Sequence, residues 1–234
     1  MLIGPQNLTL HVNHVRSRIR SAAIAAGRDP ATVTLVAVTK AQTAESVRLA
    51  ATAGVTDFGE NYLQEAVAKM DQLAQLPLRW HFIGGIQSNK TRIIAERFDW
   101  VHSVDRSSVA RRLSEQRPFH AQPLNVCLQV ALVPEPTKGG VSPDALEALA
   151  SAVAGLPRIR LRGLMCMPPP QPTLEAERRI FARLKVALED LNAGGLKLDT
   201  LSMGMSADFE SAIAEGATLV RIGTALFGSR LRSQ

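Results

Sequence analysis

A lysine at the end of a hydrophobic run has the clearest chemical potential in this sequence. Lys40 closes the segment TLVAVTK at 34–40, whose apolar residues and threonines are typical of a strand covered on both faces. An ammonium group in a poorly solvated place loses basicity, and a neutral amine attacks an aldehyde to form a Schiff base. Pyridoxal phosphate (PLP) is the natural cofactor for such a lysine. The alternative is a lysine that ends the strand and extends its amine into water.

Glycine and hydroxyl residues near two later strand ends could hold a phosphate group. The segment SMGMS at 202–206 follows one predicted strand, and RIGT at 221–224 ends another. Their backbone amides, together with the hydroxyls of Ser202, Ser206 and Thr224, could surround a phosphate dianion. Glycine and serine are also ordinary turn residues, so the hypothesis depends on these pieces meeting at one rim.

Hydrophobic periodicity predicts the elements that position these residues. A helix is expected over 8–27, and strands that alternate with helices are expected at 34–40, 55–58, 79–83, 100–104, 124–132, 161–167, 198–202 and 218–222. Eight strands is the number that closes a (β/α)8 barrel, whose functional residues gather at the carboxyl ends of the strands. We therefore predict an α/β protein with one domain over 1–234, in which an extra N-terminal helix (1–28) precedes a TIM-type barrel (33–230).

Composition excludes several classes of partner. With 234 residues, 46% of them hydrophobic, the chain can bury a full core. The net charge of +6 could attract a polyanion, but the basic residues are spread along the chain and only 4% of residues are aromatic, so no nucleic-acid partner is expected. Neither a membrane-length apolar run nor a secretory signal is present, which predicts a cytoplasmic protein without a membrane partner.

Cysteines and histidines show no metal-binding pattern. Cys127 and Cys166 lie in apolar segments without CxxC spacing and are expected to be reduced core residues. His81 lies in a predicted strand, where it could stack near a cofactor or be a buried, hydrogen-bonded histidine. The remaining histidines are interpreted as surface or helix residues: His11, His14, His102 and His120. No metal site is expected.

The sequence resembles the pyridoxal phosphate homeostasis protein family, whose members are single-domain relatives of the N-terminal barrel of alanine racemase. The resemblance lies in the segments VAVTK at 36–40, FGENY at 58–62, WHFIG at 80–84, QSNK at 87–90, RGLM at 162–165, LSMGMS at 201–206, DFE at 208–210, VRIGT at 220–224 and FG at 227–228. It covers nearly the whole chain. It implies the fold type III barrel of PLP proteins and a role in PLP homeostasis.

The resemblance also implies a role for individual residues. Lys40 would form the Schiff base with PLP, and Asn61 would lie beside the cofactor ring. The phosphate would be held by Ser202, Ser206, Gly223 and Thr224, with Met203 contributing through its backbone. Arg221 would face the pyridine nitrogen, where a permanent guanidinium supports carbanion chemistry less than a carboxylate does.

Three residues depart from the family pattern. Gly85 stands where histidine or proline is usual after FIG, Ala131 replaces an asparagine common on the fifth strand, and Gln42 replaces a second lysine found in many relatives. Glu135, Lys138 and Gly140 still match the loop after the fifth strand. Because of Gln42, a secondary transfer site that needs a neighbouring lysine is in doubt.

Two functions of different class follow from this resemblance. A carrier would buffer or deliver PLP, and a further hypothesis is that its basic surface docks on enzymes that make or use the cofactor. The alternative is a PLP-dependent amino-acid racemase or related small enzyme, which needs a second acid–base group opposite the lysine. In alanine racemases this group is a tyrosine from another domain, whereas this sequence ends just after its eighth strand and its single tyrosine, Tyr62, begins a helix. We therefore predict a monomeric carrier without catalytic residues.

Overall fold

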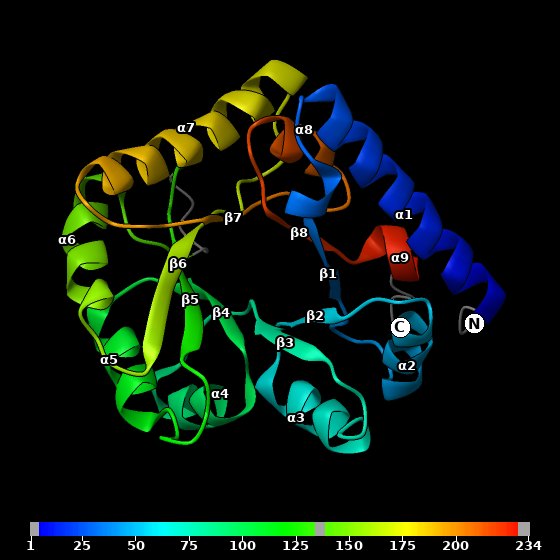
Figure 1. Cartoon of the computed structure of the whole chain (residues 1–234), viewed down its shortest axis with the longest axis horizontal. Coiled ribbons are helices and arrows are strands. Elements are labelled where there is room, and N and C mark those ends of the chain that lie inside the picture. The colour runs from blue at the N-terminus through cyan, green and yellow to red at the C-terminus, as the bar shows by residue number, and fades with distance from the viewer. Residues whose placement is uncertain (1–4, 134–138, 229–234) are drawn as a thin grey trace.

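Parallel strands form a closed barrel in chain order (Figure 1). The computed structural model describes residues 5–133 and 139–228, and within these ranges each strand pairs with its neighbours in sequence while the last pairs with the first. The strands are β1 (Thr34–Val38), β2 (Asp57–Glu60), β3 (Arg79–Phe82), β4 (Trp100–Val104), β5 (Leu124–Gln129), β6 (Ile159–Met165), β7 (Thr200–Ser202) and β8 (Leu219–Ile222). The predicted (β/α)8 barrel is confirmed.

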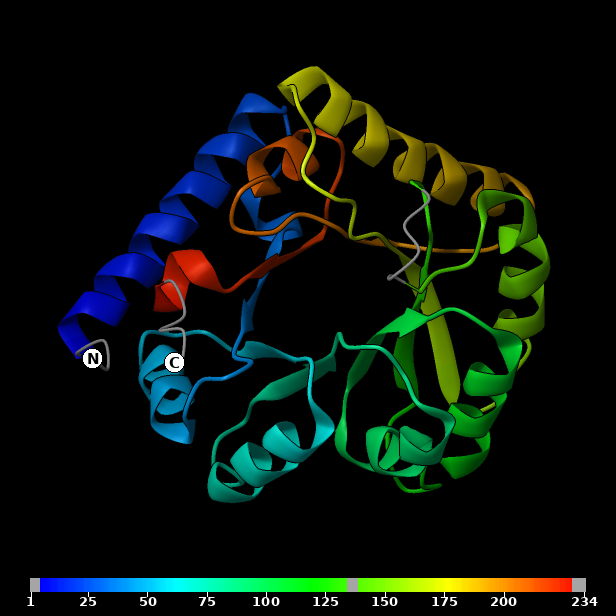
Figure 2. The same ribbon diagram turned by 180° about the vertical axis from the view of Figure 1, so that it is seen from behind.

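Helices surround the barrel on its outer side (Figures 1 and 2). The α-helices are α1 (Pro5–Ala25), α2 (Ala44–Thr52), α3 (Leu63–Gln72), α4 (Thr91–Arg97), α5 (Ser107–Gln116), α6 (Pro143–Ala154), α7 (Leu174–Ala193), α8 (Phe209–Ala214) and α9 (Thr224–Phe227). Two short 3-10 helices are η1 (Pro30–Thr32) and η2 (Ser88–Lys90). None of the helices within the described ranges is long and apolar enough to cross a membrane.

Residue types that favour helix starts stand before two of these helices. The Thr43 hydroxyl accepts a hydrogen bond from the Ser46 amide at the start of α2, and Ser142 precedes Pro143 at the first position of α6. Ser88 is of the same type, but it does not cap α4. Ser88 begins η2, and α4 follows only after Lys90. The short α9 was not predicted from the sequence, because four residues give no readable periodicity.

Apolar side chains fill the layer between the strands and the helices. Fully buried phenylalanines such as Phe58 on β2 and Phe209 on α8 belong to this core. Helix α1 lies beside α8 and α9 (Figure 1). Its buried apolar residues are Leu8, Val12, Val15 and Ile19. Burial of such a side chain contributes about 1.5–3 kcal/mol. The N-terminal helix therefore packs as part of the outer helical layer beside β8 and β1.

Candidate functional site

Sheet register brings four of the predicted cofactor residues to one end of the barrel. Val38 lies opposite Gly59 of β2, and Ala37 lies opposite Ile222 of β8. The residues just beyond these pairs are therefore neighbours at the carboxyl end of the strands, and they include Lys40, Asn61, Gly223 and Thr224. β1 ends at Val38, so Lys40 lies in the turn that follows and is half-buried there.

A buried ion pair from α3 holds the turn that carries Lys40. The Lys69 ammonium donates to the Thr39 carbonyl at 2.6 Å and to Glu60 Oε1 at 2.7 Å. The Thr39 hydroxyl donates to the same carboxylate oxygen at 2.6 Å. Burial raises the pKa of Glu60, against the opposing effect of Lys69. Because Glu60 is 0% and Lys69 5% exposed, these bonds are shielded from water and fix the backbone directly before Lys40.

The residue after Lys40 adopts an uncommon backbone conformation. Ala41 has a φ of 59°, a region that costs an ordinary residue roughly 1–2 kcal/mol. Its amide donates to Glu65 Oε2 at 2.9 Å. Glu65 belongs to α3, so this helix holds the backbone on both sides of Lys40.

Asn61 presents a polar atom that the protein does not satisfy. Its Oδ1 is buried and has no hydrogen-bond partner among the described residues. Gly84 packs directly against its backbone, since a Cβ at Gly84 would lie 2.1 Å from the Asn61 carbonyl oxygen. A buried polar atom without a partner costs about 1–3 kcal/mol, so a ligand that pairs with Asn61 would gain this energy.

The loop after β7 contacts the first turn of α9. Ser206 Oγ accepts the Ala225 amide at 3.2 Å, while Gly223 stands at the N-cap without a capping side chain. Hydroxyl and amide groups predicted to hold a phosphate thus come together here. The Met203 amide already donates to the Leu219 carbonyl at 3.1 Å, so it is part of the sheet.

Ser202 and Arg221 lie inside the barrel. The Arg221 guanidinium is 4% exposed and donates through Nη1 to Ser202 Oγ at 2.7 Å and through Nη2 to the Cys166 carbonyl at 2.9 Å. Burial lowers the pKa of Arg221 from its ordinary value. The Ser202 hydroxyl is 0% exposed and is engaged by Arg221, which differs from the open rim position expected of a phosphate ligand.

The histidines of β3 and β4 also face the barrel interior. The interpretation of His102 as a surface or helix residue is wrong, because it is 0% exposed and its Nε2 lies 2.9 Å from His81 Nδ1. His81 is equally buried and stacks on Trp100 at a ring-centroid distance of 5.6 Å. Burial, His81 and Arg221 lower the pKa of His102 well below its ordinary value, which keeps the ring neutral. Among the predicted surface histidines, His14 and His120 are exposed and His11 is half-buried.

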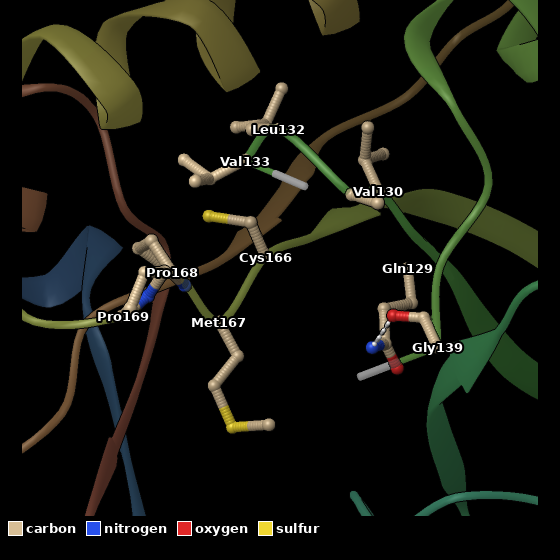
Figure 3. Close-up of a pocket in the computed structure, with 10 residues that line it drawn as sticks. Gln129, Val130, Leu132, Val133, Gly139, Cys166, Met167, Pro168 and Pro169 are labelled. Carbon is tan, nitrogen blue, oxygen red and sulfur yellow. Dashed lines mark hydrogen bonds between the residues drawn. The ribbon is translucent and has the colours of Figure 1, made fainter. Parts of the chain in front are cut away.

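A small cavity lies at the carboxyl ends of β5 and β6 (Figure 3). Its volume is about 20 Å³, and Cys166, Met167 and Gln129 are among the residues that line it. Figure 3 shows Gln129 directed toward Gly139, whose carbonyl accepts its amide, while the Cys166 and Met167 side chains point in different directions. This volume suits a water molecule and excludes a pyridine ring. The matching loop residues Glu135 and Lys138 lie outside the described part of the chain.

The residues present fit PLP chemically. They combine an amine beside a strand end, a buried amide oxygen without a partner, hydroxyl and amide groups at the start of α9, and a buried guanidinium. The described residues hold no cluster of histidine, cysteine, aspartate and glutamate that could bind a metal ion. Sequence reasoning missed Lys69 and Glu65 as supports of the lysine turn, although their spacing of four residues on a helix indicates a shared face.

Comparison with known proteins gives a consistent result. The family profile of the alanine racemase N-terminal domain matches residues 10–231. The pyridoxal phosphate homeostasis protein of Pseudomonas aeruginosa is 62% identical over 220 residues, which is 94% of each chain. The protein of the same name from Escherichia coli K12 is 47% identical over 92% of this chain and 94% of its own.

A solved structure shows that the similarity extends to the three-dimensional fold. PipY of Synechococcus elongatus, whose structure has PLP bound, is 38% identical, with a TM-score of 0.83 over 94% of this chain and 100% of its own. A fold-level likeness alone would leave the family open, but here identity extends over nearly the full length of each relative. The chain therefore belongs to the pyridoxal phosphate homeostasis protein family, within the wider family of the alanine racemase N-terminal domain.

Proposed function

We propose that this protein binds PLP as a Schiff base on Lys40 and buffers or delivers it for intracellular vitamin B6 homeostasis. The observation that carries the proposal is the convergence of Lys40, Asn61 and the start of α9 at one barrel end, in a chain 62% identical to a protein named for PLP homeostasis. PLP would supply an aldehyde and an electron-withdrawing ring, and the protein would supply the amine and the groups that orient the ring.

Three of the predicted ligands have tasks that their surroundings support. Lys40 provides the amine from a turn that α3 holds rigid. Asn61 offers its unpartnered oxygen to the ring substituents, and Arg221 provides a guanidinium for the pyridine nitrogen.

The phosphate is assigned to Ser206, Gly223 and Thr224 at the start of α9. The surroundings of the other two predicted phosphate ligands do not support that role, because the Ser202 hydroxyl is engaged inside the barrel and the Met203 amide is bonded to the Leu219 carbonyl.

We further propose that the protein is a cytoplasmic, monomeric carrier rather than an enzyme. Lys40 is the acid–base group assigned to the cofactor site. Tyr62 at the N-cap of α3 is 55% exposed, and its side chain makes no capping hydrogen bond within the described part of the chain. The proposed partners are enzymes that make or use PLP. An amino-acid racemase is the competing function, with Tyr62 as its second acid–base group.

The test is the visible absorbance of the purified protein with added PLP. A Schiff-base absorbance band that the wild type shows and Lys40→Ala lacks supports the site. Lys185→Ala is the matched control, because the Lys185 side chain is half-exposed on α7 and is not assigned to the site. Alanine and other amino acids are then added, and their enantiomeric composition is followed. Unchanged composition supports a carrier, whereas steady turnover that Tyr62→Phe abolishes would establish the racemase.

A further inference from the structure

A continuous chain of hydrogen bonds crosses the barrel interior below the proposed cofactor site. Asp57 Oδ1 lies 3.0 Å from His81 Nε2, His81 Nδ1 lies 2.9 Å from His102 Nε2, and His102 Nδ1 lies 2.7 Å from Ser202 Oγ. We call these four residues the histidine chain. Asp57 is the first residue of β2 and Ser202 the last of β7, so the histidine chain runs from one end of the barrel toward the other.

Groups with fixed roles stand at both ends of the histidine chain. Arg79 donates through Nε and Nη2 to the two carboxylate oxygens of Asp57, at 2.8 and 2.6 Å. Burial by itself would raise the pKa of Asp57, but hydrogen bonds from His81 and Arg79 outweigh it and lower the pKa, so Asp57 is an ionised acceptor. At the other end, Arg221 can only donate, and it does so to Ser202 Oγ at 2.7 Å.

When both rings are neutral, the Asp57 end determines the direction of every bond in the histidine chain. Because Asp57 only accepts, His81 must carry its proton on Nε2, which leaves Nδ1 of the neutral ring as an acceptor. His102 must then donate from Nε2 and accept at Nδ1. The hydroxyl of Ser202 donates to that nitrogen, and its oxygen is left to accept from Arg221. Each donor in the histidine chain therefore meets an acceptor when both rings are neutral.

An additional proton would break this arrangement. An imidazolium at His81 would force His102 to donate from Nδ1 to Ser202. The Ser202 oxygen could accept from both His102 and Arg221, but the Ser202 proton would lose its acceptor within the histidine chain. The imidazolium would also add a positive charge to a network that already holds Arg221 at its other end. The titratable groups near Arg221 are Cys127 on β5, Cys166 after β6 and Asp208 before α8. Burial raises the pKa of each thiol to about 12, so Asp208 is the acidic group of the three that can offset the charge of Arg221 near neutral pH.

We propose that the histidine chain positions Arg221 for the PLP ring. Its polarity orients the Ser202 hydroxyl, the Ser202 oxygen receives Nη1 of Arg221, and the Cys166 carbonyl fixes Nη2, so the guanidinium has one orientation before the ring arrives. Asp57, His81 and His102 are positioning residues, since they reach the site only through Ser202. The identity of the ring as PLP rests on the proposed function. The donor-to-acceptor direction of the bonds in the histidine chain, which we call its polarity, does not depend on that function.

The first test uses the unliganded protein. Long-range proton–nitrogen NMR spectra should show His81 and His102 as neutral rings protonated on Nε2 at pH 7. The exposed rings of His14 and His120 report a solvated imidazole in the same sample. A proton on Nδ1 of His102, or an imidazolium at either ring, would overturn the inference.

The second test compares two substitutions at His81. Glutamine can donate to Asp57 and accept from His102, so His81→Gln should keep the Nε2 tautomer of His102 and the wild-type affinity for PLP. His81→Leu removes both bonds and should shift the tautomer of His102 and weaken PLP binding by up to about tenfold, the equivalent of one hydrogen bond. His14→Leu is the matched control on the surface of α1.

The outcomes separate this inference from the proposed function. If His81→Leu left both the tautomer of His102 and the PLP affinity unchanged, the positioning role would be refuted. If His81→Leu did not fold, a roughly tenfold loss of PLP affinity in a folded His81→Gln protein that kept the Nε2 tautomer of His102 would refute it instead. If the wild type bound no PLP, the proposed function and the positioning role would both fail, while the ring signals would still decide the polarity of the histidine chain.

Discussion

Lys69→Met should strongly destabilise the protein and weaken its hold on PLP. The substitution keeps a long apolar side chain but removes the ammonium that donates to Glu60 and Thr39. Glu60 would then remain as a fully buried carboxylate with the Thr39 hydroxyl as its donor. Removal of one partner of a buried ion pair costs about 3–5 kcal/mol.

Proton uptake sets an upper limit on this loss. Glu60 has an ordinary pKa of 4.5, and each pH unit above that value costs about 1.4 kcal/mol to protonate the group. Protonation of Glu60 therefore removes the buried charge in the variant at a cost of about 3 kcal/mol at pH 7 and less than about 1 kcal/mol at pH 5. A carboxyl whose folded-state pKa is raised makes a contribution to protein stability that is lost as pH rises. The difference in unfolding free energy between the variant and the wild type should therefore shrink as pH falls from 7 to 5.

Urea unfolding at the two pH values measures this deficit. The double variant Lys69→Met with Glu60→Gln is the control, because it removes both charges and should recover most of the loss with little dependence on pH. PLP affinity should fall in the single variant, since Thr39 directly precedes Lys40. A single variant that loses less than about 1 kcal/mol, or a double variant no more stable than the single one, would refute the role given to this ion pair.

Three further predictions concern packing and titration. Gly84→Ala should destabilise the protein and abolish PLP binding because its Cβ would lie 2.1 Å from a backbone oxygen, whereas Gly85→Ala meets nothing within 4 Å and should change stability by less than about 0.5 kcal/mol in urea unfolding. Cys127 and Cys166 should resist thiol reagents in the native protein and react after unfolding, because both are buried with a pKa of about 12; rapid native reaction would contradict this. Asp57→Asn should flatten the fall of stability in acid, because wild-type Asp57 has a lowered pKa and contributes stability that is lost as pH falls through its folded-state value.

Local sequence signals were sufficient to predict the barrel. The alternation of apolar segments with caps such as Thr43 and the Ser142–Pro143 pair marks elements whose bounds the structure reproduces within a few residues. Strand ends were less well predicted, because hydrogen-bond pairing and not hydrophobicity ends a strand. β1 illustrates this, since the apolar and threonine run continues to Thr39 while pairing stops at Val38.

The polar interior could not be predicted by the same signals. His102 lies between Val101 and Ser103 in a short strand, and a histidine with such neighbours is equally compatible with a surface strand position. Its burial depends on His81 one strand away and on Ser202 a hundred residues later, and neither contact leaves a mark in local periodicity. Side-chain alternation along β3 and β4 was the available clue, because residues that point into a barrel must satisfy one another there.

Both buried polar networks serve the same physical purpose at the proposed site. The ion pair of Lys69 and Glu60 fixes the backbone that carries the Lys40 amine, and the histidine chain contacts the guanidinium that we propose faces the ring. A carrier must hold PLP and also release it, so affinity that comes from preorganised groups is useful because it needs few enclosing contacts. Perturbing either network should therefore change PLP affinity without changing which lysine carries the cofactor, and reduction of the bound form followed by peptide mapping should find Lys40 in every variant that still binds.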